Sequence, residues 1–197
     1  MKQYSEACDQ NRAPILHVIR DVFGSARRVL EIGSGTGQHA VYFGQQLPHL
    51  QWQTSDLPGS HASINAWINE ANLRNVHAPL ALDVVTGPWP ETIYDGIFSA
   101  NTTHIMSWPM VVSMFAGIGQ ILAPGASFCL YGPFNYDNAY TSPSNERFDA
   151  WLKDRDPDSG IRNLQDLDAL AMTHGLQLSA DNGMPANNRL LVWRRQA

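Results

Sequence analysis

Short apolar segments alternate with segments of helical periodicity over the first two thirds of the chain. The spacing of apolar side chains predicts helices over residues 13–23, 37–47, 60–72 and 109–122. Strand candidates lie between and after them, at residues 28–32, 50–56, 76–84, 94–101 and 126–134. This alternation is typical of right-handed βαβ crossovers, which build a parallel sheet. We therefore predict an α/β fold.

The last third of the chain follows a different pattern. Helical periodicity over 145–155 and 164–174 is followed by two strand candidates, 176–182 and 188–195, with no helix between them. Two strands joined by so short a connection must be antiparallel, because a parallel pair needs a long crossover. The full prediction is a Rossmann-like sheet of seven strands, mostly parallel, with a C-terminal antiparallel hairpin and helices on both faces.

Composition favours a single-domain protein and disfavours nucleic-acid-binding, membrane and disulfide-rich classes. The 197 residues contain no internal repeat and suit one domain over 1–197. Thirteen Lys and Arg against 18 Asp and Glu give a net charge of −5 without a basic cluster, which disfavours nucleic acid as a partner. No apolar stretch predicts a signal peptide or membrane span, so we expect a cytoplasmic protein. Two scattered cysteines predict neither a disulfide framework nor a metal site.

A glycine-rich loop follows the first predicted strand, in the sequence VLEIGSGTGQHA at 29–40. The ligand site of a doubly wound sheet lies near this first βα turn. We expect Gly33 to allow the tight turn, Gly35 to let the backbone approach a ligand, and Gly37 to let the helix pack on the strand. A dinucleotide fingerprint would need its third glycine at 38, where this chain has Gln38, and a P-loop would need a lysine.

Acidic residues accompany this loop. Glu31 lies two residues before the first glycine, Asp56 ends the second strand, and Asp83 lies at the end of the third. The Asp56 carboxylate could accept hydrogen bonds from both hydroxyls of a ribose. For Asp83, capping of the following turn remains an alternative.

The string E-x-G-x-G-x-G, with Asp56 and Asp83 after it, resembles the first motifs of class I S-adenosylmethionine-dependent methyltransferases. The resemblance implies S-adenosylmethionine as cofactor and S-adenosylhomocysteine as product. It places Glu31 near the cofactor ammonium or the loop amides, and Asp83 near the adenine amine. If the segment 1–25 covers the cofactor, Arg12 could meet the cofactor carboxylate; a surface ion pair is the alternative.

Further strings resemble a small methyltransferase-like family with no assigned substrate. They are QNRAPIL near the N-terminus, NTTHIMSW after the fourth strand, LYGPF in the fifth, and GMPANN with LLVW near the C-terminus. This resemblance covers nearly the whole chain and supports the prediction of a single domain.

Methyl transfer requires an aligned nucleophile and, for some nucleophiles, removal of a proton. Asn101 could face the methionine part of the cofactor or the acceptor, and His104 could act as a general base near neutral pH. Helix capping and a structural histidine are the alternatives. The segment 132–165 is predicted to form a substrate loop and lid, and the pocket candidates are Trp108, Tyr131, Tyr136, Tyr140, Ser142 and Asn145. We interpret 185–188 as a plain turn.

The sequence therefore predicts methyl transfer from S-adenosylmethionine to a small molecule or an exposed protein group. A non-catalytic module that binds S-adenosylmethionine or adenosine is the main alternative. A nicotinamide-dependent oxidoreductase is disfavoured by Gln38.

Overall fold

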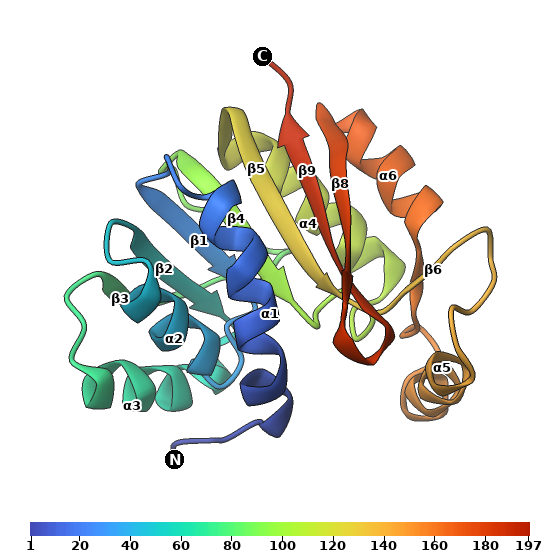
Figure 1. Cartoon of the computed structure of the whole chain (residues 1–197), viewed down its shortest axis with the longest axis horizontal. Helices are drawn as coiled ribbons and strands as arrows, with labels where there is room; N and C mark the ends of the chain where they lie inside the picture. The colour runs from blue at the N-terminus through green and yellow to red at the C-terminus, as the bar shows by residue number, and fades with distance from the viewer.

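The computed structural model describes residues 1–197 and contains a seven-stranded sheet in the order β3-β2-β1-β4-β5-β9-β8 (Figure 1). The strands are β1 (Arg28–Ile32), β2 (Gln51–Asp56), β3 (Val76–Ala81), β4 (Tyr94–Ala100), β5 (Leu122–Gly132), β8 (Leu176–Met184) and β9 (Asn188–Arg195). The first five pair in parallel, whereas β9 is antiparallel to both β5 and β8. The predicted mostly parallel sheet with a terminal hairpin is confirmed.

Helices cover both faces of this sheet. The helices are α1 (Glu6–Val22), α2 (Gln38–Gln46), α3 (His61–Ala71), α4 (Trp108–Ile121), α5 (Pro143–Arg155) and α6 (Leu164–Thr173). Helices α1 and α2 bury their apolar residues in one core cluster, and α4 and α6 bury theirs in the other. Successive strand residues point to opposite faces, so Val29 joins the first cluster and Leu30 the second. This explains why apolar residues follow one another without alternation over residues 128–131 of β5, which face the two clusters in turn.

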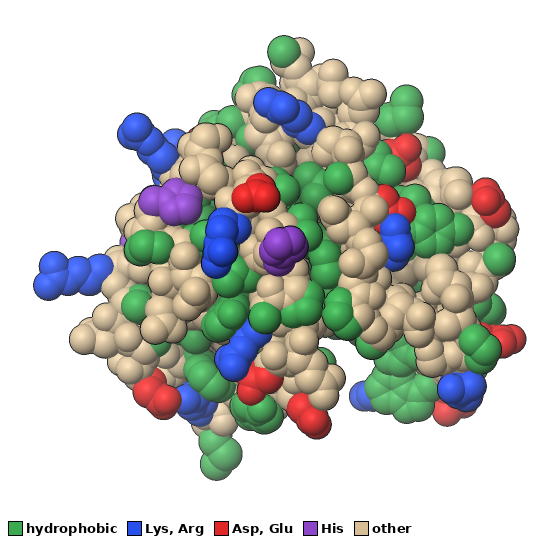
Figure 2. Space-filling model, in the orientation of Figure 1, with side chains coloured by type: hydrophobic (Ala, Val, Ile, Leu, Met, Phe, Trp, Pro, Cys, Tyr) green, Lys and Arg blue, Asp and Glu red, His purple; other side chains and the backbone are tan.

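Helix α5 stands apart from the sheet, below its β8 edge in Figure 1. Figure 2 shows the molecule hollowed at its lower edge, between the N-terminal helix and α5. The chain reaches α5 through β6 (Phe134–Asn135) and returns through β7 (Arg162–Asn163), which pair as a separate two-stranded sheet. The short 3₁₀ helices are η1 (Pro58–Ser60) and η2 (Pro185–Asn187).

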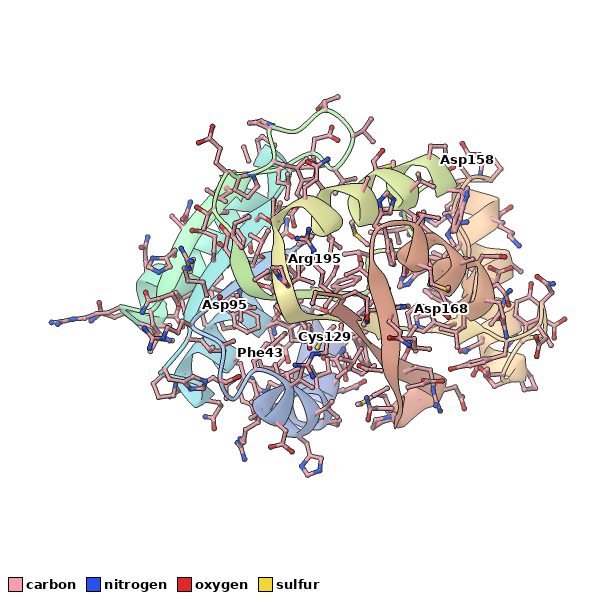
Figure 3. The ribbon with its side chains drawn as sticks, turned by 90° about the horizontal axis from the view of Figure 1, so that it is seen from above. Phe43, Asp95, Cys129, Asp158, Asp168 and Arg195 are labelled. Carbon is pink, nitrogen blue, oxygen red and sulfur yellow. The ribbon has the colours of Figure 1, made fainter.

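Large aromatic side chains fill the core on both sides. Figure 3 shows, from above, α1 and α4 on opposite sides of the sheet with Cys129 between them. Trp193 stacks on Phe128 with ring centroids 5.7 Å apart, and its Nε1 donates to Asp168 Oδ1 of α6 at 3.0 Å. The indole is fully buried, so this bond satisfies a polar group that would otherwise be costly to bury.

Several boundaries differ from the predictions. Helix α1 begins at Glu6 rather than at residue 13, because its first turns are polar and carry no apolar periodicity. Strand β5 begins at Leu122 rather than at residue 126, because residues 122–125 form an irregular strand start with a register shift opposite β4. Strand β3 ends at Ala81, two residues before Asp83. Strands β6 and β7 have two residues each, too few for any periodicity to predict.

Both cysteines are free thiols, Cys129 buried and Cys8 partly buried. Burial raises the pKa of both thiols. None of the helices combines the length and apolar character that crossing a membrane requires.

We predict that Gly96→Ala destabilises the fold. Gly96 lies in β4 beneath the end of α1, and a Cβ there would lie 2.7 Å from Phe23 Cε1 and 3.2 Å from Val29 Cγ2. Overpacking of this kind costs about 1–3 kcal/mol. Urea unfolding measures the loss. The control is Gly59→Ala, whose Cβ would meet no atom within 4 Å; an equal loss in both variants would contradict the packing argument.

Candidate active site

The three loop glycines all adopt left-handed backbone, with φ of 73° at Gly33, 58° at Gly35 and 95° at Gly37. A Cβ at Gly33 would lie 2.6 Å from Thr102 Cγ2, and one at Gly37 would lie 2.9 Å from Ile64 Cα. A Cβ at Gly35 would meet no atom within 4 Å. Gly33 and Gly37 are therefore needed for packing, and Gly35 alone faces open space, as its predicted role requires.

The contact of Gly37 corrects one prediction. We expected this glycine to let α2 pack on the first strand, but its neighbour is the backbone of α3 at Ile64. The reason is topological, because the loop passes over the start of α3, where Ser63 Oγ donates to Thr36 O at 2.9 Å.

Hydrogen bonds fix the loop to the end of β2. The backbone N–H groups of Gly33 and Ser34 both donate to Ser55 O at 3.0 Å. Gly35 N donates to Asp56 Oδ2 at 2.7 Å, and Leu57 N and Ser60 Oγ donate to Oδ1 at 2.7 and 3.0 Å. The partly exposed Asp56 carboxylate is thus held beside the open face of Gly35.

Glu31 is buried beneath the loop, with 1% of its surface exposed. Trp52 Nε1 donates to its Oε2 at 3.1 Å, and no cationic side chain forms an ion pair with it. Burial raises the Glu31 pKa to about 7. A buried carboxyl without a cation, next to an open loop and a second carboxylate, fits a ligand that carries positive charge and hydroxyl groups.

Asp83 and Arg12 make contacts of their own. Asp83 Oδ1 accepts from Val85 N at 2.8 Å and Thr86 N at 3.3 Å, and these bonds lower the Asp83 pKa. Arg12 pairs with Asp9 at 2.8 Å and lies over the Tyr42 ring. The structure therefore shows the alternative given for each residue: Asp83 caps a turn, and Arg12 forms a surface ion pair. Cofactor contacts by these two side chains stay predictions.

The N-terminal segment lies beside the glycine loop. Ser5 N donates to Gln38 Oε1 at 2.6 Å, and Gln38 Nε2 donates to Ser5 O at 3.2 Å. Gln3 N donates to Ser63 Oγ at 2.9 Å, and Trp67 Nε1 donates to Gln3 O at 2.8 Å. We call residues 2–5 the N-terminal strap. That the segment 1–25 covers a cofactor stays a prediction.

A cavity of about 640 Å³ opens beyond the carboxyl ends of β4 and β5. Four predicted site residues border it: Asn101, His104, Tyr131 and Asn145. The segment that leads to this cavity packs against the glycine loop, since Gly33 lies close to Thr102, the residue next to Asn101. This is the candidate acceptor cavity.

His104 has 6% of its surface exposed, and its ring meets the edge of Phe148 with centroids 5.3 Å apart. Burial, with a contribution from the nearby Arg162 guanidinium, lowers the His104 pKa to about 4. A general base must be unprotonated to accept a proton, and the role of His104 as a general base stays a prediction. At pH 7 the His104 side chain is a neutral imidazole.

Asn101 and Tyr131 flank this histidine. Asn101 adopts φ of 58°, and its backbone N donates to Tyr131 O at 2.8 Å. A Cβ at Gly132 would lie 3.8 Å from His104 Nδ1 and 3.9 Å from Asn101 Oδ1, so both side chains converge on this glycine. Neither the Asn101 amide nor the His104 ring has a hydrogen-bond partner within the protein. Their polar atoms are not fully enclosed by the protein, and both residues border the cavity.

The remaining pocket candidates lie elsewhere. Trp108 and Tyr140 border a second cavity of about 850 Å³, on the α4–α6 side of β6 and β7. Tyr136 donates to Asp181 Oδ2 on β8 at 2.7 Å, and Ser142 caps α5 by accepting from Asn145 N at 3.1 Å. None of these four side chains borders the acceptor cavity. An acceptor contact by these residues stays a prediction.

Sequence reasoning missed several side chains of the cavity. Asn11 enters from α1, Phe148 from α5, and Asn187 and Asn188 from the β8–β9 turn, which we had interpreted as a plain turn. Asn11 and Asn188 lie beside the Tyr131 hydroxyl, where hydrogen bonding lowers the Tyr131 pKa and burial, the larger effect, raises it. The signal available was the Pro-Ala-Asn-Asn turn, where Ala186 and Asn187 have positive φ.

A protein-family model matches residues 2–195, nearly the whole chain. The chain belongs to the family described as "Protein of unknown function (DUF938)". Membership of a family whose function is undefined agrees with the resemblance to a family of unassigned substrate. The assignment leaves the chemistry to be argued from the site.

Solved structures with the same fold include several methyltransferases. An O-methyltransferase family protein from Burkholderia thailandensis superimposes with a TM-score of 0.83 at 16% identity, over 94% of this chain and 56% of that one. The S-adenosylmethionine-dependent methyltransferase SibL gives 0.81 at 22% identity, over 97% and 56%. PigF with SAH gives 0.76 at 14% identity, over 93% and 56%. The predicted class I methyltransferase fold is confirmed, and the chain spans just over half the length of these structures.

We predict that Glu31→Gln stabilises the protein at high pH. The folded state favours protonated Glu31, so its contribution to stability is present below pH 4.5 and is lost as the pH rises through about 7. Between pH 5 and pH 8 the variant should gain about 2–3 kcal/mol over the wild type. The amide oxygen that this substitution introduces can still accept from Trp52.

Urea unfolding of both proteins at the two pH values measures this difference. The matched control is Glu91→Gln, which changes an exposed side chain. A Glu31→Gln difference that does not change with pH would contradict the raised pKa.

Proposed function

We propose that this protein transfers a methyl group from S-adenosylmethionine to a small molecule bound in the acceptor cavity. The observation that carries the proposal is the arrangement of the glycine loop. Gly35 faces open space beside the fixed Asp56 carboxylate, and the same loop packs, through Gly33 and Thr102, against the segment that leads to Asn101 and His104. A donor site and an acceptor site would thus share one wall.

The residues present suit this cofactor. Asp56 could accept hydrogen bonds from the ribose hydroxyls, since Gly35, Leu57 and Ser60 orient its two oxygens from one side. Glu31 lies beneath the loop as an acid without a cation, and a cofactor ammonium would supply one. When bound, S-adenosylmethionine supplies a methyl group activated by its attachment to a positively charged sulfur.

The acceptor cavity supports a small molecule rather than an exposed protein group. Its volume of about 640 Å³ lies in the usual range of small-molecule sites. His104 is neutral at pH 7 and could accept a proton from the nucleophile through a ring nitrogen, while Asn101 could orient the nucleophile. The O-methyltransferases among the structures of this fold support oxygen as the atom that is methylated.

A module that binds the cofactor without turnover is the second candidate. The low His104 pKa favours it, because a histidine with a pKa of about 4 is a weak base. The two candidates share the donor site and differ only in what enters the acceptor cavity.

We predict micromolar binding of S-adenosylmethionine and at least a tenfold loss in Asp56→Ala. Hydrogen bonds to a charged group contribute about 1.5–3 kcal/mol each, and tenfold corresponds to about 1.4 kcal/mol. Isothermal titration calorimetry measures the affinity, and circular dichroism checks that the variant is folded. Asp154→Ala, on the exposed face of α5, should bind as the wild type does. Binding of NAD without binding of S-adenosylmethionine would refute the proposal.

We also predict that Gly35→Ala folds but binds the cofactor at least tenfold more weakly. The new Cβ would touch no protein atom and would project into the space assigned to the ligand. A left-handed alanine costs roughly 1–2 kcal/mol of stability. The matched control is Gly175→Ala, which has φ of 72° and equally open surroundings beyond α6. Equal affinity in both variants would place the ligand elsewhere.

A further inference from the structure

The acceptor cavity contains no ionic side chain. None of its 15 lining residues is Asp, Glu, Lys or Arg, although these make up 16% of the chain. The lining instead combines His104, Tyr131, Phe148 and two prolines with six side-chain amides, which belong to Gln10, Asn11, Asn101, Asn145, Asn187 and Asn188. The wall is therefore polar but uncharged.

The second cavity differs from the acceptor cavity in having ionic side chains in its lining. It is bordered by Lys153, Arg162 and Asp166, so ionic groups do line the neighbouring concave surface. Arg162 also approaches His104 from outside the acceptor cavity. Its guanidinium donates to the carbonyl oxygens of Thr103, Met106 and Asp158, and Arg162 borders the second cavity but not the acceptor cavity.

The histidine adds no charge either. His104 is a neutral imidazole at pH 7 because of its burial and the nearby Arg162. A charged acceptor would therefore leave water without finding a counter-ion, which is costly. A protonated amine would find no carboxylate in the cavity lining, and a carboxylate would find no Lys or Arg there.

Amide side chains suit a different ligand. An asparagine amide carries donors and an acceptor, and a hydroxyl group can pair with one of each. Some of these amide atoms already have protein partners, such as Asn11 Oδ1 with His39 Nε2 at 2.6 Å and Asn187 Nδ2 with Ser144 Oγ at 3.2 Å. The Asn101 amide has no partner within the protein and faces the cavity. Asn145 is held in place, since its Nδ2 donates to Asn187 O at 3.2 Å and Thr141 Oγ1 at 2.9 Å, which leaves its carbonyl oxygen without a protein donor.

We propose that the acceptor is an uncharged small molecule that presents a hydroxyl group to Asn101 and His104. This inference rests on the proposed function. In the transfer, a new bond forms between the hydroxyl oxygen and the methyl carbon, and the bond from that carbon to sulfur breaks, with its electron pair left on sulfur. The hydroxyl proton passes to a His104 ring nitrogen and then to water.

Three probes of similar size and different charge test this selectivity: benzyl alcohol, benzoate and benzylammonium. Ligand-observed saturation-transfer NMR titrations on the full chain at pH 7 measure their affinities. We expect benzyl alcohol to bind at least tenfold more tightly than either ion. Equal or tighter binding of benzoate or benzylammonium would overturn the proposal, and so would a failure of all three to bind.

A charge introduced at the rim of the acceptor cavity tests whether the probes bind there. Asn188 is partly exposed and lines the cavity beside Tyr131. In Asn188→Asp we expect benzylammonium to bind at least threefold more tightly than in the wild type, and benzoate to bind more weakly. The matched control is Asn138→Asp, an exposed asparagine that borders the second cavity and should leave the order unchanged. An identical response in both variants would overturn the assignment to this cavity.

Titration of S-adenosylmethionine into the same samples separates this inference from the function on which it rests. Charge-selective probe binding without cofactor binding would refute methyl transfer and leave the selectivity of the cavity standing. Cofactor binding with no preference among the probes would refute the inference alone.

Discussion

The hydrogen bonds between the glycine loop and the end of β2 hold the candidate site together. Ser55 accepts from two successive loop amides, and the Asp56 side chain accepts from a third. Because β1 and β2 are parallel neighbours, their carboxyl ends lie side by side, and β2 alone holds the first three residues of the loop. Helix α3 holds the next residue, since Ser63 Oγ donates to Thr36 O. The acceptor cavity depends on this arrangement, since the Gly33 contact with Thr102 sets where the segment after β4 begins.

Burial shifts the pKa values of the two buried titratable groups of the site in opposite directions, and it favours the neutral form of both. It raises the pKa of Glu31 to about 7 and lowers that of His104 to about 4. In each case the neutral form gains, because a low-dielectric environment disfavours the ion. The partly exposed Asp56 carboxylate lies beside these groups, where the proposed function would put the hydroxyl groups of a ligand.

The sequence predicted the order and type of the main elements because their apolar periodicity is strong. It predicted the donor site as a motif, since Glu31, the glycines and Asp56 follow one another along two adjacent strands. The cavity could not be predicted in this way. Its side chains come from α1, the loop after β4, the end of β5, the start of α5 and the β8–β9 turn, and only the folded chain brings these five segments together. The pKa of His104 likewise depends on burial, which no local pattern reveals.

The two ends of the chain have different surroundings, because the N-terminal strap at residues 2–5 is bound beside the glycine loop. The N-terminus lies near α3 and the glycine loop, whereas the C-terminus lies at the opposite end of the sheet, beyond β9 (Figure 1). A fusion partner at the first residue would extend from the surface beside the proposed cofactor site, where Lys2 pairs with Glu70 and lies over the Trp67 ring. A purification tag or surface attachment at the last residue would leave both the proposed cofactor site and the cavity open to solution.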